Sequence, residues 1–236
     1  MITVLVPPGV TAGRRERLEE SERHHLRVRR AQAGEVVALR DGEGLVGTGR
    51  LATSGSEWLV DVEAVERRPR PAELTLAIGA GDRERFAWLV EKAAELGVTR
   101  VVPLETERTS GVASRLRDVH LARLRRQALE AIKQCGAVWT LEIDAPVSLA
   151  DFAARPRSGV GLLADAAGAP PPPVLDGGPV AVVVGPEGGL SAAERAALLA
   201  AGYEPTALAP HTLRFETAAL AAATAVTTAR LRGTHG

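Results

Sequence analysis

The sequence predicts a two-part protein of the α/β class, with a small β-rich head followed by a larger domain built on a parallel sheet. Short apolar runs separated by glycines fill the first 70 residues, a texture typical of strands joined by turns. Beyond them, strand-like runs alternate with helical patterns of about 10 to 20 residues, which favours a parallel sheet with helices on both faces. The polar segment 66–71, broken by two prolines, separates the two textures and is predicted to be a linker.

In the head, the runs Val36 to Leu39 and Trp58 to Val65 predict strands. Segment 14–30 contains the pattern of a short helix. Turns are predicted at the glycines between the runs, at Gly34, Gly42, Gly44, Gly47 and Gly49. The head is therefore expected to be a small barrel or sandwich.

In the larger domain, strands and helices are predicted in alternation. The helix over 82–96 shows the reasoning, because Phe86, Leu89 and Val90 recur at helical spacing and Gly97 ends the pattern. The predicted strands are 74–78, 99–104, 138–143, 161–164, 179–184 and 204–209. The other predicted helices are 116–134, 148–154, 191–201 and 217–230.

Composition excludes several classes of protein. The chain carries 29 Lys and Arg against 29 Asp and Glu, and 45% of its residues are hydrophobic, which excludes a mainly disordered chain. Cys135 is its one cysteine, so neither an internal disulfide nor a zinc cluster is expected. No apolar run reaches the length of a membrane span, and the first residues lack the pattern of a secretory signal. We expect a cytoplasmic protein with no metal and no membrane partner.

Two strand-to-helix loops carry the unusual chemistry. Segment 185–191, GPEGGLS, has three glycines, which is more than one turn needs and lets backbone approach a ligand closely. Ser191 and Glu194 have the spacing of a helix capping box. Segment 208–218, LAPHTLRFETA, is the second loop. Ligands of parallel sheets bind beyond the carboxyl ends of the strands, where both loops are predicted to lie.

Together these loops resemble the paired signature of the RsmE family, the bacterial 16S rRNA uridine-N3 methyltransferases of the SPOUT superfamily. Three further segments resemble the family in the expected order, at 24–44 (HHLRVRRAQAGEVVALRDGEG), 88–109 (WLVEKAAELGVTRVVPLETERT) and 127–136 (QALEAIKQCG). The resemblance thus spans nearly the whole chain. Five positions depart from the family pattern, namely Arg29, Thr106, Ala137, Ala209 and His211.

The resemblance implies a PUA-like β-barrel that binds RNA at 1–68 and a SPOUT methyltransferase domain with a trefoil knot at 72–236. It implies S-adenosyl-L-methionine as cofactor, a homodimer, and 16S rRNA or the small ribosomal subunit as substrate. The matching motif positions implied to hold the cofactor are Gly185, Glu187, Gly188, Leu208, Ala209, Leu213 and Ala218.

The implied catalytic residues are Arg214, Glu216 and Arg108. Arg214 is expected to stabilise negative charge on the uracil carbonyls or to grip a phosphate. Glu216 is expected either to accept the N3 proton or to orient Arg214 by a salt bridge. Arg108 is expected to reach the site from the loop that contains it.

Two arginine-rich stretches predict the RNA-binding surface, although the net charge of the chain is zero. Segment 14–30 holds seven Arg against four Glu, and segment 108–133 holds seven basic residues against two acidic ones. Phosphate contacts supply most of the non-specific affinity for nucleic acid. The residues expected to contact RNA are Arg27, Arg29, Arg30, Arg115, Arg123 and Arg126.

Three other functions stay open from the sequence. One is another SPOUT reaction, such as ribose 2′-O-methylation of tRNA, although the L-R-x-E-T-A pattern and the head argue against it. A second is a non-catalytic RNA-binding protein that keeps the fold, which the intact Glu187, Arg214 and Glu216 disfavour. The third is a small-molecule α/β enzyme, which the arginine clusters disfavour.

Overall fold

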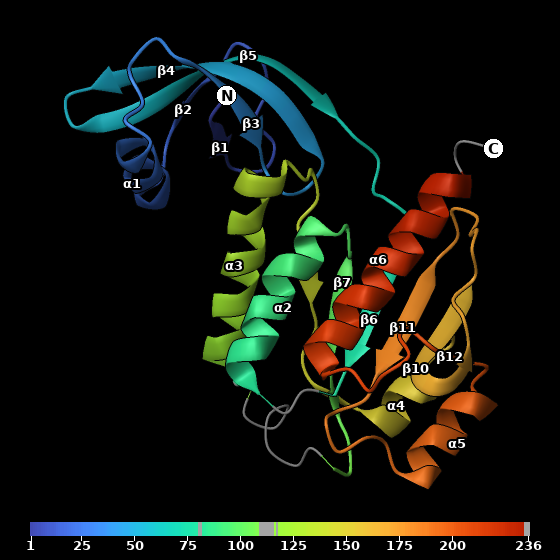
Figure 1. The fold of residues 1–236 in the computed structure, drawn as a ribbon. Helices are drawn as coiled ribbons and strands as arrows, with labels where there is room; N and C mark the ends of the chain where they lie inside the picture. The colour runs from blue at the N-terminus through green and yellow to red at the C-terminus, as the bar shows by residue number, and fades with distance from the viewer. Residues whose placement is uncertain (80–81, 109–115, 117, 234–236) are drawn as a thin grey trace. The chain divides into compact units, whose positions relative to one another are not determined.

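The computed structural model describes residues 1–79, 82–108, 116 and 118–233 (Figure 1). The chain divides into two compact units. Unit 1 consists of Met1–Arg70 and Leu129–Thr140, and unit 2 of Pro71–Ala128 and Leu141–Gly236. Helix α3 (Asp118–Cys135) contributes to both units.

Unit 1 is built on a five-stranded sheet in the order β1-β3-β4-β5-β2. Strands β1 and β3 are parallel, and the other neighbours are antiparallel. Its elements within the first 70 residues are β1 (Thr3–Leu5), β2 (Arg15–Arg17), α1 (Glu20–Val28), β3 (Val36–Arg40), β4 (Leu45–Ser54) and β5 (Glu57–Arg67). Leu26 of α1 belongs to the same buried cluster as Val4, Leu39 and Val60 of the sheet. Burial of this apolar face is the main force that holds the helix on the sheet.

Two glycines of unit 1 lie in a strand and not in the turns that the sequence predicts. A Cβ at Gly47 would lie 2.6 Å from the Ala64 carbonyl oxygen, and one at Gly49 would lie 2.7 Å from the Asp61 carbonyl oxygen. The pairing of β4 with β5 shifts register between Thr48 and Gly49. These glycines therefore allow the close approach of backbones at an irregularity in the sheet.

The predicted helix within 14–30 is also shorter than its pattern. Residues 15–17 form strand β2, and the helix begins at Glu20. Arg15 pairs with Asp61 and Arg17 with Glu57 of the neighbouring strand β5. These cross-strand ion pairs explain why arginine-rich residues extend the sheet here.

Residues 129–140 complete unit 1 from far along the chain. The side chains of Lys133 and Glu22 form an ion pair and are only 3% and 2% exposed. The second carboxylate oxygen of Glu22 accepts a hydrogen bond from the Leu5 backbone N–H at 3.0 Å. Trp139 donates its indole N–H to the carbonyls of Arg68 and Pro69, at 3.2 and 3.1 Å. Trp139 also forms a bridge with Glu43, which leaves only 142–143 of the predicted strand 138–143 in the sheet of unit 2.

Unit 2 is built on a seven-stranded sheet in which each pairing of neighbours is parallel. The order is β12-β10-β11-β6-β7-β8, and β9 also pairs with β7. The strands are β6 (Leu74–Ile78), β7 (Arg100–Glu105), β8 (Glu142–Ile143), β9 (Val147–Ser148), β10 (Val160–Ala169), β11 (Val180–Val184) and β12 (Glu204–Thr206). The helices, besides α3, are α2 (Arg83–Glu95), α4 (Leu149–Ala153), α5 (Ala192–Ala200) and α6 (Phe215–Gly233).

Helices cover both faces of the unit 2 sheet, as the alternating pattern predicts. Helices α2 and α6 lie on one face, and α4 and α5 lie on the other (Figure 1). All five residues of β6 are buried, in agreement with a strand covered on both sides. On the face of α4 and α5, Leu149, Phe152 and Leu198 pack against Ala77 and Val183 of the sheet.

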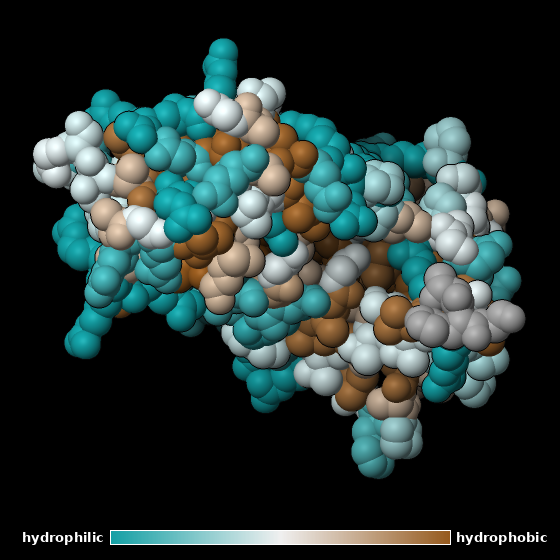
Figure 2. Space-filling model, turned by 90° about the horizontal axis from the view of Figure 1, so that it is seen from above, coloured by the Kyte–Doolittle hydropathy of each residue, from teal (hydrophilic) through white to brown (hydrophobic). Residues whose placement is uncertain are grey.

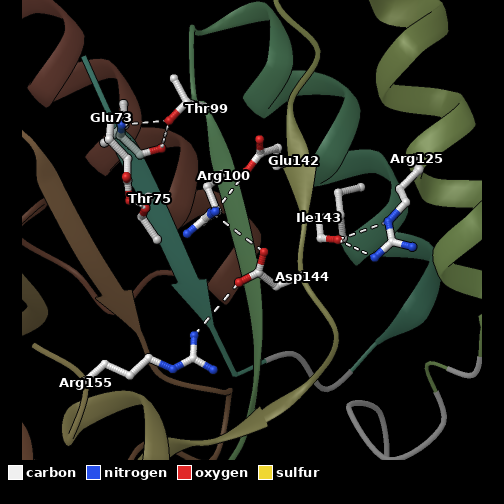
Figure 3. A network of polar contacts seen from close by, with 10 residues as sticks. Glu73, Thr75, Thr99, Arg100, Arg125, Glu142, Ile143, Asp144 and Arg155 are labelled. Carbon is white, nitrogen blue, oxygen red and sulfur yellow. Dashed lines mark hydrogen bonds and ion pairs between the residues drawn. The ribbon is translucent and has the colours of Figure 1, made fainter. Parts of the chain in front are cut away.

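A polar network holds the amino ends of β6 and β7 (Figure 3). Arg100 donates to Glu142 at 2.9 Å, and it lies 3.7 Å from a carboxylate oxygen of Asp144. Arg125 of α3 donates two hydrogen bonds to the Ile143 carbonyl, at 3.1 and 2.8 Å. Thr99 exchanges two hydrogen bonds with the Leu74 backbone, at 2.9 and 3.2 Å. These contacts fix the edge of the sheet at β8.

Three other predicted boundaries in unit 2 are displaced. The strand predicted at 161–164 continues to Ala169, because residue 169 pairs again with Thr206 after a register shift. The strand predicted at 204–209 ends at Thr206. The last helix begins at Phe215, two residues earlier than predicted, because its first turn is part of the second loop.

The surface mixes hydrophilic residues with smaller hydrophobic patches (Figure 2). Large hydrophobic residues that are at least half exposed include Val28, Val119 and Leu231. Within the described ranges, no helix combines the length and hydrophobicity needed to cross a membrane. The described residues also contain no cluster of His, Cys, Asp or Glu that could hold a metal ion. Cys135 is exposed.

Candidate functional site

A cavity of about 390 Å³ opens in unit 2 at the carboxyl ends of β10, β11 and β12. This is the edge of a parallel sheet at which ligands bind. Its walls come from the end of β10, the glycine loop (residues 185–190), the second loop (residues 207–214) and the start of α6. The lining residues are Leu163, Ala164, Asp165, Ala166, Val184, Gly185, Pro186, Glu187, Gly189, Leu190, Arg195, Thr206, Leu208, Ala209, His211, Thr212, Leu213, Phe215 and Ala218.

The glycine loop turns sharply out of the buried strand β11. Gly189 has a φ of +69°, a backbone conformation that glycine adopts without strain. Gly79, at the end of β6, lies directly beneath Pro186, since a Cβ there would approach the Pro186 Cδ to 2.9 Å. The loop therefore rests on the neighbouring strand with no room for a larger residue at position 79.

The predicted capping box forms at the start of α5. The Ser191 hydroxyl accepts the Glu194 N–H at 3.2 Å, and the Glu194 carboxylate accepts the Ser191 N–H at 2.8 Å. The other carboxylate oxygen of Glu194 accepts the Glu107 backbone N–H at 2.8 Å. One buried carboxylate thus joins the end of the glycine loop to the chain that follows β7.

Arg108 also contacts the glycine loop. Its guanidinium donates to the Gly188 carbonyl at 2.8 Å, and a Cβ at Gly188 would lie 3.3 Å from the Arg108 Cβ. Arg108 does not line the cavity. Its position is that of a support behind the loop.

The second loop leads into α6 and brings its first residues to the cavity. Phe215 and Ala218 are buried, lie three positions apart on the helix, and line the cavity. Arg214 directly precedes the helix and is exposed, and its carbonyl accepts the Ala218 N–H at 2.9 Å. Its guanidinium has no hydrogen bond or ion pair with another described residue.

Glu216 points away from the cavity, toward α2. Its carboxylate is 3.5 Å from the guanidinium of Arg85 and only 11% exposed. The other carboxylate oxygen is buried with no hydrogen-bond partner among the described residues. No ion pair joins Glu216 to Arg214 in the part of the chain that the structure describes, so Arg85 takes the place in which the sequence analysis had considered Arg214.

The cavity brings together most of the residues predicted to bind the cofactor. Gly185, Glu187, Leu208, Ala209, Leu213 and Ala218 all line it, whereas Gly188 does not. None of the three residues predicted to be catalytic lines it either. They flank it instead, with Arg214 and Glu216 at the start of α6 and Arg108 behind the glycine loop.

Sequence reasoning missed two charged residues of the cavity wall. Asp165, in β10, accepts the Ala167 backbone N–H at 2.9 Å and the Arg195 Nε at 2.8 Å. These hydrogen bonds, the one from Ala167 first, hold the pKa of Asp165 below its usual range. Asp165 and Arg195 belong to separate elements and no motif spacing links them, so only the fold brings them together.

Most arginines predicted to contact RNA are exposed. Arg27, Arg29 and Arg30 lie at the end of α1 in unit 1. Arg30 has a φ of +54°, a backbone conformation that is uncommon for a residue other than glycine. Arg123 and Arg126 are exposed on the part of α3 that belongs to unit 2, and Arg115 lies outside the described residues.

Comparison with known proteins gives matches over both units. The family model described as an RNA methyltransferase domain matches residues 68–227, and the RNA methyltransferase PUA domain matches residues 18–60. Ribosomal RNA small subunit methyltransferase E of Aquifex aeolicus is 32% identical over 204 residues, which are 85% of this chain and 89% of that protein. The corresponding protein of Synechocystis is 28% identical over 85% of this chain and 69% of its own length.

Solved structures agree with these matches. The crystal structure of ribosomal RNA small subunit methyltransferase E from Neisseria gonorrhoeae, bound to S-adenosylmethionine, superposes with a TM-score of 0.86. It is 25% identical and covers 98% of both chains. A Legionella pneumophila structure with bound S-adenosylmethionine has a TM-score of 0.82, 27% identity, and coverage of 94% of this chain and 95% of that one. The chain therefore belongs to the RNA methyltransferase family that includes ribosomal RNA small subunit methyltransferase E.

Proposed function

We propose that this protein is an S-adenosylmethionine-dependent methyltransferase that modifies N3 of a specific uridine in the 16S rRNA of the small ribosomal subunit. The observation that carries the proposal is the cavity at the carboxyl ends of β10, β11 and β12. Both motifs that resemble the family meet there, one on each side. Family membership and the S-adenosylmethionine-bound relatives support the same assignment.

The cavity suits S-adenosylmethionine in size and in chemistry. Its volume of about 390 Å³ lies in the range of small-molecule sites. Small residues such as Gly185, Ala209 and Ala218 leave room for a flat base and a sugar close to backbone groups. The adenosine of this cofactor has no phosphate, so no phosphate-binding lysine is needed. When bound, the cofactor supplies a methyl group on a positively charged sulfur.

The protein then has to position uracil and handle the N3 proton. We assign Arg214 to the negative charge that develops on the uracil carbonyl oxygens when the proton leaves. Its guanidinium is exposed and free of other described partners, and it stands at the positive end of the α6 dipole. We assign Arg108 to holding the glycine loop in place through the Gly188 carbonyl.

Glu216 is the proposed acceptor of the N3 proton. Its buried carboxylate keeps one oxygen without a described hydrogen-bond partner, while Arg85 faces the other oxygen at 3.5 Å. A buried acceptor of this kind is costly unless a donor reaches it. Arg85 favours the charged carboxylate, which is the form that can take a proton.

The remaining expectations about fold and partners form part of the same proposal. They are a PUA-like β-barrel for RNA binding at 1–68, a SPOUT domain with a trefoil knot at 72–236, a homodimer, and a cytoplasmic location. The exposed arginines at the end of α1 and on α3 support an RNA surface, because they are free to approach phosphates.

The test is to incubate the protein with labelled S-adenosylmethionine and small ribosomal subunits that lack the modification. The RNA is then digested and its nucleosides are identified by mass spectrometry. We expect 3-methyluridine at a single position. A 2′-O-methyl nucleoside would assign a different SPOUT reaction, and unlabelled RNA would refute the proposal.

Variants then test the residue roles. Arg214→Ala is expected to lower turnover at least about 100-fold, the effect of losing one group that stabilises developing charge, with cofactor affinity unchanged. Arg232→Ala, an exposed arginine at the far end of the same helix, is the matched control and is expected to retain activity. Unchanged turnover of Arg214→Ala would refute its role.

A further inference from the structure

We propose that Asp165 and Arg195 form the site that recognises the amino-acid end of the cofactor, where an ammonium and a carboxylate share one carbon atom. The inference rests on the proposed S-adenosylmethionine function and extends it from the adenosine to the opposite end of the molecule. It assigns a role to two residues that the family motifs do not include.

The two side chains form an ordered pair on the cavity wall. Asp165 comes from β10 and Arg195 from the start of α5, and both line the cavity. The Arg195 Nε donates to one carboxylate oxygen of Asp165 at 2.8 Å, and the Ala167 N–H donates to the other at 2.9 Å. The carboxylate is 20% exposed and the guanidinium 44% exposed, so both remain within reach of a ligand.

Each partner keeps unused hydrogen-bonding capacity. A carboxylate offers about four acceptor positions, and two of those on Asp165 are occupied. A guanidinium has five N–H donors, and among the described residues only the Nε–H of Arg195 has a partner. The wall therefore presents free acceptors and free donors side by side.

This arrangement matches a zwitterion. An α-amino-acid group needs an acceptor for its ammonium and donors for its carboxylate at adjacent points. Arg195 is the one lining residue with a permanent positive charge, so it is the natural partner of the ligand carboxylate. Asp165 is ionised at neutral pH, because its hydrogen bonds lower its pKa, and it attracts the ammonium.

The pair is not needed for the local fold. The start of α5 is already fixed by the Ser191 and Glu194 capping box. Ion pairs that are this exposed contribute little to stability. Variants of either residue are therefore expected to fold, which lets ligand binding be measured directly.

The experiment compares two ligands by isothermal titration calorimetry. S-adenosylmethionine carries the amino-acid end, whereas 5′-methylthioadenosine has the same adenosine and a sulfur but lacks that end. Arg195→Ala and Asp165→Asn are each expected to raise the Kd for S-adenosylmethionine about tenfold or more, the loss typical of one charge-assisted hydrogen bond. The Kd for 5′-methylthioadenosine is expected to change less than about twofold.

Arg155→Ala is the matched control, because Arg155 is an exposed arginine of the same unit that does not line this cavity. It is expected to leave both Kd values unchanged, and circular dichroism checks the folding of all three variants. Equal weakening of both ligands, or no change in either, would overturn the assignment to Asp165 and Arg195. If the wild-type protein bound neither ligand, the proposed cofactor itself would be wrong.

Discussion

Replacing Lys133 by Met is expected to destabilise unit 1 strongly. The ammonium of Lys133 is almost wholly buried and pairs with the equally buried carboxylate of Glu22. Without it, Glu22 keeps only the hydrogen bond from Leu5, and an uncompensated charge stays inside the protein. Breaking a buried pair on one side costs about 3 to 5 kcal/mol. Removing the charge as well, in Glu22→Gln/Lys133→Met, is expected to restore all but about 1 to 2 kcal/mol, since Gln still accepts from Leu5.

Urea unfolding followed by tryptophan fluorescence measures this effect. In a Trp88→Phe background, the remaining Trp58 and Trp139 both report on unit 1. With a slope of about 2 kcal/mol per molar urea, the midpoint of Lys133→Met is expected to fall by about 1.5 to 2.5 M. Glu130→Gln removes the exposed partner of Lys133, at 2.7 Å, and is the control, with an expected loss below about 1 kcal/mol. A loss below about 1 kcal/mol for Lys133→Met, or a double variant less stable than the single one, would refute the reasoning.

Three further predictions concern the glycine loop and the effect of pH. Gly79→Ala is expected to weaken S-adenosylmethionine binding at least about tenfold in calorimetry, because the new Cβ displaces Pro186; unchanged affinity would contradict this. Ser191→Ala is expected to lower the free energy of unfolding by about 1 kcal/mol in urea, whereas Ser191→Thr keeps the capping hydroxyl and most of the stability. Burial, and secondarily the charge of Lys133, lower the pKa of His25, so the unfolded chain binds its proton first as the pH falls below about 6.5. Stability of unit 1 is therefore expected to decrease from that pH downward, and His25→Gln is expected to flatten the decrease in unfolding curves measured between pH 5 and 7.

Elements decided by local sequence were predicted well. The strand over 74–78 coincides with β6, because its apolar run is short and bounded by polar residues. The helix over 82–96 becomes α2 with Asp82 as its N-cap and Leu96 as its C-cap. The capping box at Ser191 forms as predicted. In each case the chain carries its own start and stop signals.

Features decided by distant contacts were not predictable in the same way. Gly47 and Gly49 look like turn residues, and only the backbone of β5 explains their place in a strand. Segment 15–17 is arginine-rich and becomes a strand because Asp61 and Glu57 face it. Nothing within 129–140 indicates that it joins the first 70 residues.

The site shows the same division. The two motifs predicted that Gly185 and Leu208 would meet at one cavity, and the structure places both on its wall. The partner of Glu216 came from α2, where Arg85 has no motif to mark it. Asp165 likewise becomes a site residue only through the parallel pairing of β10 with its neighbours.

The split composition of unit 1 has a consequence for synthesis on the ribosome. Its first 70 residues emerge before residues 129–140, which supply Lys133 and Trp139. At usual elongation rates of about 5 to 20 residues per second, the interval lasts on the order of 4 to 14 s. During that time Glu22 has no counter-charge from Lys133. Unit 1 therefore cannot close as an early, independent domain, and its completion waits until the first strands of unit 2 have also been made.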